Sequence, residues 1–201
     1  VGVLPSSCPV FWWDGVAAMD LSDLQLATPR LLLRLPRRYD YEAWAASGAD
    51  EEATRVIGGM QARSPAWRSL AATLGSWHLQ GFGMFSVIEK ATGRWVGRVG
   101  PWQPEGWPGT EVGWSIAREA WGRGYAPEAA AASTDWAFDH LGWSEVIHTI
   151  VPDNANSKTV AAKLGSTYLR MDRLPEPHHE KPVEVWGQTR AQWQARKAVH
   201  P

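Results

Sequence analysis

A glycine-rich segment, residues 121–127, has the residue types and spacing best suited to hold an anion. It reads Trp-Gly-Arg-Gly-Tyr-Ala-Pro and lies between a segment with strand periodicity and a segment with helical spacing. Such a turn exposes backbone N–H groups at the start of a helix, where the helix dipole adds partial positive charge. The segment therefore predicts a phosphate or pyrophosphate site, with a purely structural glycine turn as the alternative.

Two known phosphate-binding motifs are excluded by the residues of this turn. A dinucleotide fingerprint requires a third glycine three places after the second, and Pro127 stands there. A P-loop requires Gly-Lys-Ser/Thr at the start of the helix, whereas Gly124 is followed by Tyr125 and Ala126. The site is therefore of a different class from both.

Two other groups of reactive side chains are interpreted as structural or solvated. His178 and His179, flanked by Glu176 and Glu180, lie in a proline-rich segment, so a solvated loop is favoured over a metal site. His148 alternates with apolar residues on a predicted strand, which is typical of a structural histidine. We predict no metal site.

The elements that must position the glycine turn predict a mixed α/β domain. Residues 110–116 alternate as a strand does, residues 127–141 have helical spacing, and residues 145–151 are rich in β-branched residues. Strand, helix and strand in this order predict a right-handed parallel crossover.

Further elements are predicted on both sides of this unit. Before it we expect strands at residues 30–35, 84–89 and 94–99. We also expect helices there, at residues 40–47 and 64–81. After it we expect a helix capped by Asn154 or Asn156 and an antiparallel pair of strands at 167–174 and 183–189. Residues 1–27 have no clear period and predict a loosely ordered N-terminal extension, which leaves residues 28–201 as a single domain.

The composition bounds the class of protein. With 201 residues and 44% hydrophobic residues, the chain can bury a core, and the 14 tryptophans are expected to serve mainly in packing. Its single cysteine, Cys8, excludes a disulfide framework and is not expected to act as a nucleophile. The net charge of −1 predicts no nucleic-acid or membrane partner. Without a long apolar run or a basic residue before Arg30, we expect a cytoplasmic protein.

Three blocks of this sequence resemble the GNAT superfamily of acetyltransferases and, more narrowly, its ribosomal-protein N-terminal acetyltransferases. The first block is Glu-Val-Gly-Trp-Ser-Ile at 111–116, and the second is the glycine turn together with the Glu-Ala that follows it, at 121–129. The third block consists of two runs, Pro-Asp-Asn-Ala-Asn-Ser at 152–157 and Val-Ala-Ala-Lys-Leu-Gly at 160–165. The blocks come in the family's order, and the resemblance covers roughly residues 28–193. It implies a GNAT-like central sheet that is mostly antiparallel, with one parallel crossover and helices on both faces.

The resemblance also implies that acetyl-CoA is the donor. In the family, the turn amides hold the CoA pyrophosphate, the preceding strand pairs its backbone with pantetheine, and the Asn-x-x-Ser element lies near the sulfur. The implied cofactor-binding residues are Trp114, Ser115, Ile116, Gly122, Arg123, Gly124, Tyr125, Ala126, Asn154 and Ser157. The family often has Gln or Arg where Glu119 stands, and because a carboxylate repels a pyrophosphate we expect Glu119 to face solvent.

Catalytic roles follow from the same resemblance, each beside a simpler alternative. Glu111 is the candidate base that deprotonates the acceptor amine, unless it is only a solvent-facing strand residue. Ser157 or Tyr168 is the candidate group that protonates the departing thiolate, although Ser157 could simply cap a helix. A backbone N–H of the strand would stabilise the oxyanion. Trp102 and Trp107 are expected to shape the acceptor pocket or to pack at the base of a loop.

The predicted function is the transfer of an acetyl group from acetyl-CoA to a primary amine by direct attack. The acceptor is either a peptide N-terminus or a small-molecule amine, and a homodimer is left open. One alternative is a CoA- or acyl-CoA-binding sensor without turnover. A second is an unrelated phosphate-binding α/β protein.

Overall fold

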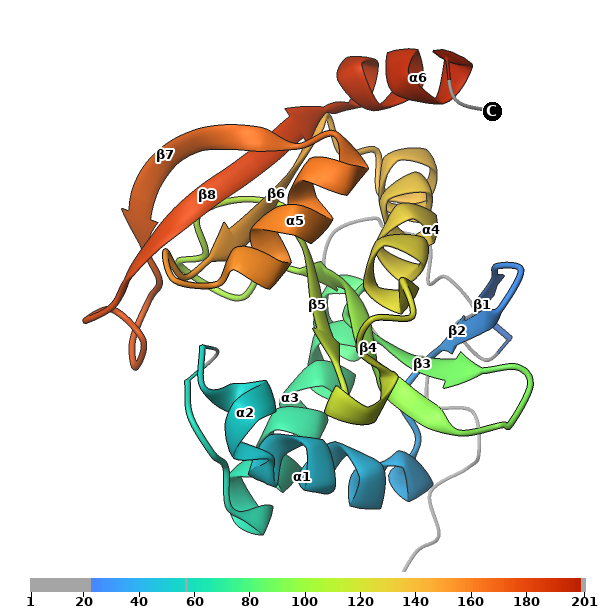
Figure 1. Ribbon diagram of the computed structural model, residues 1–201, viewed down its shortest axis with the longest axis vertical. Helices are drawn as coiled ribbons and strands as arrows, with labels where there is room; N and C mark the ends of the chain where they lie inside the picture. The colour runs from blue at the N-terminus through green and yellow to red at the C-terminus, as the bar shows by residue number, and fades with distance from the viewer. Residues whose placement is uncertain (1–22, 57, 200–201) are drawn as a thin grey trace, which may run out of the picture.

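The computed structural model describes residues 23–56 and 58–199, and within them eight strands form one sheet (Figure 1). The order across the sheet is β1-β2-β3-β4-β5-β6-β8-β7. All neighbours are antiparallel except β5 and β6, which are parallel. The strands are β1 Gln25–Ala27, β2 Leu31–Arg34, β3 Phe85–Glu89, β4 Trp95–Trp102, β5 Glu111–Ile116, β6 Glu145–Ile150, β7 Thr167–Arg173 and β8 Pro182–Thr189. The mostly antiparallel sheet with one parallel crossover is therefore confirmed.

Six α-helices accompany the sheet in the described part of the chain. They are α1 Tyr41–Ala49, α2 Glu51–Thr54, α3 Arg63–Gln80, α4 Tyr125–His140, α5 Ala155–Leu164 and α6 Arg190–Val199. Figure 1 shows α1, α2 and α3 grouped at one end of β5, whereas α4 and α5 lie beside its other half. Two short 3₁₀ segments, Arg38–Asp40 and Arg118–Ala120, precede α1 and the glycine turn.

Two apolar clusters hold the helices against the sheet. The larger one joins the sheet to α4 and includes Val87, Val112 and Ala137, all fully buried. The smaller one packs Trp44 of α1 and Leu70 of α3 against Trp95 of β4. Helices therefore cover both faces of the sheet, and several of the tryptophans serve in packing as expected, among them Trp44, Trp77, Trp136 and Trp193.

Glycines and one asparagine set the ends of the helices near the site. Gly81 and Gly165 end α3 and α5 in the left-handed region, and the side chain of Asn154 accepts from the Ser157 N–H to cap α5. The helix expected from Pro127 begins two residues earlier, at Tyr125. Pro127 fits there because the first turn of a helix does not use its N–H groups.

Three elements were not expected from the sequence: β1, α2 and α6. Strand β1 lies inside the segment 1–27 that we assign to an extension, and it pairs with β2. Residues 1–22, including Cys8, lie outside the part of the chain that the structure describes. The boundary between an N-terminal extension and the domain at residue 28 therefore remains a prediction. Within residues 23–56 and 58–199, no helix has both the length and the apolar content that crossing a bilayer requires.

Candidate active site

Strands β5 and β6 run parallel but separate soon after they meet. Their register includes one pair, Glu111 opposite Ile147, whereas β5 pairs with β4 from Glu111 opposite Trp102 to Ile116 opposite Gly97. The second half of β5 therefore has an edge that no described strand covers. An open edge of this kind can bind an extended molecule through main-chain hydrogen bonds.

A cavity of about 490 Å³ lies between this edge, the glycine turn and the start of α5. Its size is typical of a small-molecule site. All the residues predicted to bind the cofactor, except Arg123, line its wall: Trp114, Ser115, Ile116, Gly122, Gly124, Tyr125, Ala126, Asn154 and Ser157. The structure therefore brings together residues that the sequence separates by more than forty positions.

The glycine turn presents main-chain donors to this cavity. Gly122 and Gly124 have φ angles of 74° and 75°, which glycine adopts without steric cost, and Gly124 is the N-cap residue of α4. The N–H groups in the first turn of a helix have no partner within it, and the helix dipole is positive there. The geometry therefore suits a negatively charged group.

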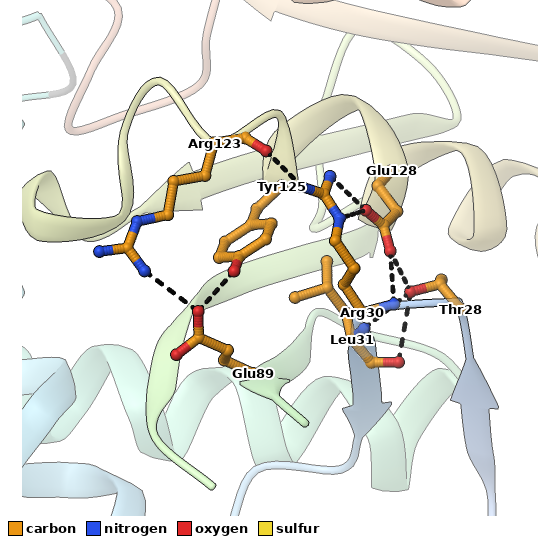
Figure 2. Close-up of polar contacts among 7 residues, drawn as sticks. All are labelled: Thr28, Arg30, Leu31, Glu89, Arg123, Tyr125 and Glu128. Carbon is orange, nitrogen blue, oxygen red and sulfur yellow. Dashed lines mark hydrogen bonds and ion pairs between the residues drawn. The ribbon is translucent and has the colours of Figure 1, made fainter. Parts of the chain in front are cut away.

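A polar network behind the turn fixes its main chain (Figure 2). Arg30 donates from Nη1 to the carbonyl oxygen of Arg123 at 2.7 Å and from Nε to Oε2 of Glu128 at 2.7 Å. Glu128 also accepts from Thr28 Oγ1 at 2.6 Å and from the Arg30 N–H at 3.0 Å. Because the C=O and N–H of a trans peptide point in opposite directions, holding the Arg123 carbonyl also orients the N–H of Gly124.

The side chain of Arg123 belongs to the same network. Its Nη1 donates to Oε1 of Glu89 at 3.1 Å, and the Tyr125 hydroxyl donates to the same oxygen (Figure 2). Hydrogen bonds from Thr92 and Tyr125, together with Arg123, hold the pKa of Glu89 below its usual value. Arg123 is thus absent from the cavity wall, and any role in cofactor binding is left to its main-chain amide.

The side chain of Glu119 faces solvent, as expected. Its side chain is 61% exposed, its carboxylate is 3.7 Å from Arg94, and it is not part of the cavity wall. A carboxylate in this position does not oppose an anion in the glycine turn.

A second cavity, of about 410 Å³, meets the first along β5. The residues common to both walls are Val56, Trp114, Ser115, Asn154 and Ser157. The second wall also contains Trp102, Trp107 and Glu111, so the residues predicted for the acceptor pocket and for the base lie in one cavity. A molecule in one cavity can therefore reach a molecule in the other at the middle of β5.

Glu111 is buried in the second cavity, not directed to solvent. Its side chain accepts hydrogen bonds from Trp107 Nε1, from Thr149 Oγ1 at 2.9 Å and from the Thr149 N–H at 3.2 Å. Burial disfavours the carboxylate more strongly than these bonds favour it, and it raises the pKa of Glu111 to about 7. A carboxyl group with this pKa is well matched to take up a proton near neutral pH.

Ser157 lies where the two cavities join, and its hydroxyl proton is available. The Trp114 indole donates from Nε1 to Ser157 Oγ at 3.2 Å. Because an indole N–H only donates, the serine oxygen is the acceptor and its own O–H can donate elsewhere. Asn154 binds the Ser157 main-chain N–H at 3.0 Å, so capping and a place in both cavity walls coexist in these residues.

His148 is buried with a partner at each ring nitrogen, and it also lines the second cavity. Its Nδ1 is 2.7 Å from the Val112 carbonyl oxygen, so Nδ1 carries the proton and Nε2 accepts from Ser166 Oγ at 2.9 Å. Gln188 Nε2 donates to the same Ser166 oxygen at 2.9 Å. Burial lowers the pKa of His148 to about 4, so the ring is neutral at pH 7 and packs against Trp114 with centroids 4.8 Å apart.

The prediction of Tyr168 as a catalytic acid is corrected by its position. Tyr168 lies on β7 at the edge of the sheet, is 50% exposed, and packs edge-on against Trp186. It lines neither of the two cavities. The helix that ends at Gly165 leads directly into this edge strand, and β8 and β6 separate it from β5.

Three residues of the site were missed by sequence reasoning. Thr149 and Arg98 line the second cavity, and Arg30 supports the turn from behind. The parallel register offered a signal for Thr149, which lies two residues after Ile147, the partner of Glu111. No comparable signal existed for Arg30, whose partner Glu128 is 98 residues away.

The loop between β7 and β8 contributes to the second cavity. His178, Glu180 and Lys181 line its wall, so this loop is part of the site and not only a solvated connection. Among residues 23–56 and 58–199, no group of three or more His, Cys, Asp or Glu side chains is arranged to hold a metal ion.

The sequence is similar to that of an uncharacterized protein, YkkB, and the fold is similar to that of a solved acetyltransferase. YkkB of Bacillus subtilis (strain 168) is 34% identical over 108 residues, which is 53% of this chain and 60% of that protein. The chain thus matches less than two thirds of this relative's length. A solved acetyltransferase from Agrobacterium tumefaciens str. C58 is 29% identical, with a TM-score of 0.73 over 88% of this chain and 100% of that one.

The ribosomal-protein branch is also represented among similar folds. The ribosomal-protein-S5-alanine acetyltransferase from Vibrio fischeri aligns over 85% of this chain and 99% of that one, with 18% identity and a TM-score of 0.64. The sequence model of the acetyltransferase (GNAT) domain matches residues 30–167, a range that contains the glycine turn, β5 and the Asn154–Ser157 element. With this match over more than half of its length, the chain belongs to the GNAT acetyltransferase family.

Proposed function

We propose that this protein transfers an acetyl group from acetyl-CoA to a primary amine, by direct attack of the amine on the thioester. One observation carries the proposal. The cavity bounded by the glycine turn joins, at the middle of β5, a second cavity that holds a buried carboxyl group with a pKa of about 7. Family membership supports acetyl transfer, and this geometry supports an acceptor that must lose a proton.

The residues of the first cavity fit acetyl-CoA. The amides of the glycine turn and the start of α4 would hold the pyrophosphate, and the uncovered edge of β5 at Trp114–Ile116 would pair with pantetheine. When bound, acetyl-CoA supplies an activated acetyl thioester. A main-chain N–H on the open edge of β5 would stabilise charge on the thioester oxygen.

The proton required for transfer moves through two residues of this chain. An alkylamine has a pKa near 10 and is almost fully protonated at neutral pH, so Glu111 removes a proton from it directly or through one water. The nitrogen loses its second proton as the tetrahedral intermediate collapses, and the Ser157 hydroxyl, whose oxygen accepts from Trp114, takes up this proton as it passes its own to the departing sulfur. Ser157 lies where the two cavities meet, and Glu111 lies further into the second cavity.

Release of free thiol from acetyl-CoA in the presence of a panel of amines tests this function. The panel includes small amines, amino acids and short peptides with a free N-terminus. We expect thiol release that depends on an amine and falls in Glu111→Gln. Stabilisation by CoA with no thiol release from any amine would instead establish a CoA-binding sensor. Absence of any stabilisation by CoA would contradict the proposal.

A further inference from the structure

The wall of the second cavity contains a half-buried positive charge, Arg98, with no described counter-charge. Arg98 lies on β4 directly opposite Ser115 of β5, and its side chain forms part of the cavity wall. Its guanidinium lies over the Trp44 ring, 4.5 Å from the centroid. Among residues 23–56 and 58–199, no carboxylate lies within ion-pair distance of Arg98, and its one hydrogen bond runs from Nη1 to Ser69 Oγ at 3.0 Å. Four of the five guanidinium N–H groups are therefore without a protein acceptor in the described part of the chain.

The unpaired nitrogens of this half-buried guanidinium are accessible, because none of them is among the buried side-chain atoms that lack a partner. Burial alone lowers the pKa of Arg98 to about 10, which still leaves the side chain charged at neutral pH. A stacked guanidinium presents a flat, fixed set of donors, and the matching acceptor is a planar carboxylate that binds through both oxygens.

The position of Arg98 relative to Glu111 bears on what the acceptor looks like. Glu111 and Ser115 are four residues apart on β5, so Glu111 and Arg98 lie on the same face of the sheet, about 13 Å apart along the strand. Trp114 and Ser115, where the two cavities meet, lie at the Arg98 end of this interval. An acceptor that extends from the junction into the second cavity therefore passes Arg98 first and reaches toward Glu111 further along the strand.

We propose that the acceptor is an amine that carries a carboxylate a few bonds from the reacting nitrogen, and that Arg98 binds this carboxylate. The proposal rests on the proposed function and specifies its substrate class. One guanidinium balances the single negative charge of a carboxylate, whereas a phosphate dianion carries two negative charges. At the mouth of the cavity, the exposed Glu180 and Lys181 offset each other. The carboxylate comes from a free amino acid or from an acidic residue next to a peptide N-terminus.

The alternative role of Arg98 is purely structural, as a cation packed between Trp44 and the sheet. The two roles differ in one measurable respect. A structural cation leaves the enzyme indifferent to charge on the acceptor, whereas a binding residue makes kcat/KM depend on it.

Matched acceptors test the proposal in the wild-type protein. One series compares phenylalanine with phenylalaninamide and 2-phenylethylamine. The other compares two tripeptide amides, one beginning with Ala-Asp and one beginning with Ala-Asn. We expect kcat/KM for the carboxylate member to exceed that of its neutral counterpart by roughly tenfold or more in one series, which identifies the source of the carboxylate. Equal rates within both series would overturn the proposal and leave the acetyltransferase function intact. Thiol release from no amine at all, with CoA still bound, would refute both.

Arg98→Met then connects the preference to the residue. We expect the ratio between matched acceptors to approach one, while the KM for acetyl-CoA and the stabilisation by CoA stay unchanged. Arg94→Met is the control, because Arg94 precedes the same strand, is 64% exposed and lines neither cavity. If Arg98→Met does not fold, Arg98→Lys keeps the charge but loses the planar fork, and we expect it to retain a reduced preference. A preference that survives in Arg98→Met would contradict the assignment.

Discussion

At the scale of single residues, burial sets the protonation of the two groups nearest the middle of β5. It raises the pKa of Glu111 to about 7, so this carboxyl group both holds and releases a proton near neutral pH, and it lowers the pKa of His148 to about 4, so this ring stays neutral well into the acid range. The type and position of Glu111 were predictable from the sequence. Its burial was not, because it depends on Trp107 in the preceding loop and on Thr149, 38 residues away.

Replacing Glu111 by Gln should change the pH profile of the reaction. In the wild type, we expect kcat/KM to rise with pH through a pKa of about 7, because the base must be ionised to accept a proton. In Glu111→Gln, the rate near pH 7 should fall by roughly 100-fold, and the loss should shrink at higher pH as the amine deprotonates by itself. Initial rates between pH 6 and 9.5 measure both. An equal loss at every pH would remove Glu111 as the base.

His148 makes stability depend on pH on the acid side. Its folded pKa is about 4 and its ordinary value is 6.5, so the unfolded chain binds a proton that the folded chain does not. Its contribution is therefore present above pH 6.5 and lost as the pH falls toward 4, by roughly 3 kcal/mol in total. Urea unfolding from pH 4.5 to 7.5 should show a steeper loss in wild type than in His148→Gln.

A matched control for this prediction is His78→Gln. His78 is exposed on α3, and we expect its variant to follow the wild-type pH dependence. Parallel loss of stability in the wild type and in His148→Gln would contradict the account of His148 as a buried neutral histidine.

At the scale of elements, the order of strands and helices from β2 to β8 followed from periodicity, prolines and glycines. The exceptions have physical reasons. Strand β1 has three residues and α2 has four, too few for a period to be visible, and α6 buries only Trp193. The divergence of β5 from β6 could not be predicted from the sequence, because it depends on how α4 and α5 pack beside the strands. That divergence is what opens the site.

The glycine turn depends on the network behind it, and Arg30 tests this. Arg30→Met removes the donor to the Arg123 carbonyl and one partner of Glu128. We expect the Kd for CoA to rise roughly tenfold, because the Gly124 amide is no longer held in place, while the KM for the acceptor stays unchanged. Titration calorimetry with CoA measures the first effect and initial rates measure the second.

Arg63→Met is the matched control for Arg30→Met. Arg63 also forms an exposed pair with a glutamate, Glu42, and lies over a tyrosine ring, 5.0 Å from the centroid of Tyr41. It lies at the start of α3 and lines neither cavity. An equal loss of CoA affinity in both variants would show that the effect is general destabilisation and not support of the turn.

At the scale of the whole molecule, the sheet brings two functions to one point. One half of β5 borders a cavity rich in main-chain donors, the other half carries an acidic side chain, and the two cavities meet between them. Residues from separate parts of the chain form the site, on β4, the loop before β5, β5, the turn before α4, β6, the start of α5 and the loop between β7 and β8. The sequence predicted site residues on several of these parts, Trp102 of β4 included, whereas Arg98 on β4 and Thr149 on β6 emerged only from the fold.

Titration calorimetry with CoA, on the wild-type protein and on Gly124→Val, tests the central claim most directly. The account predicts one binding site per chain with a Kd in the micromolar range, accompanied by a rise in melting temperature. In Gly124→Val binding should be weakened at least tenfold, because φ at this position is 75° and valine cannot adopt it without strain. Absence of heat and of any shift in melting temperature in the wild type would contradict the account.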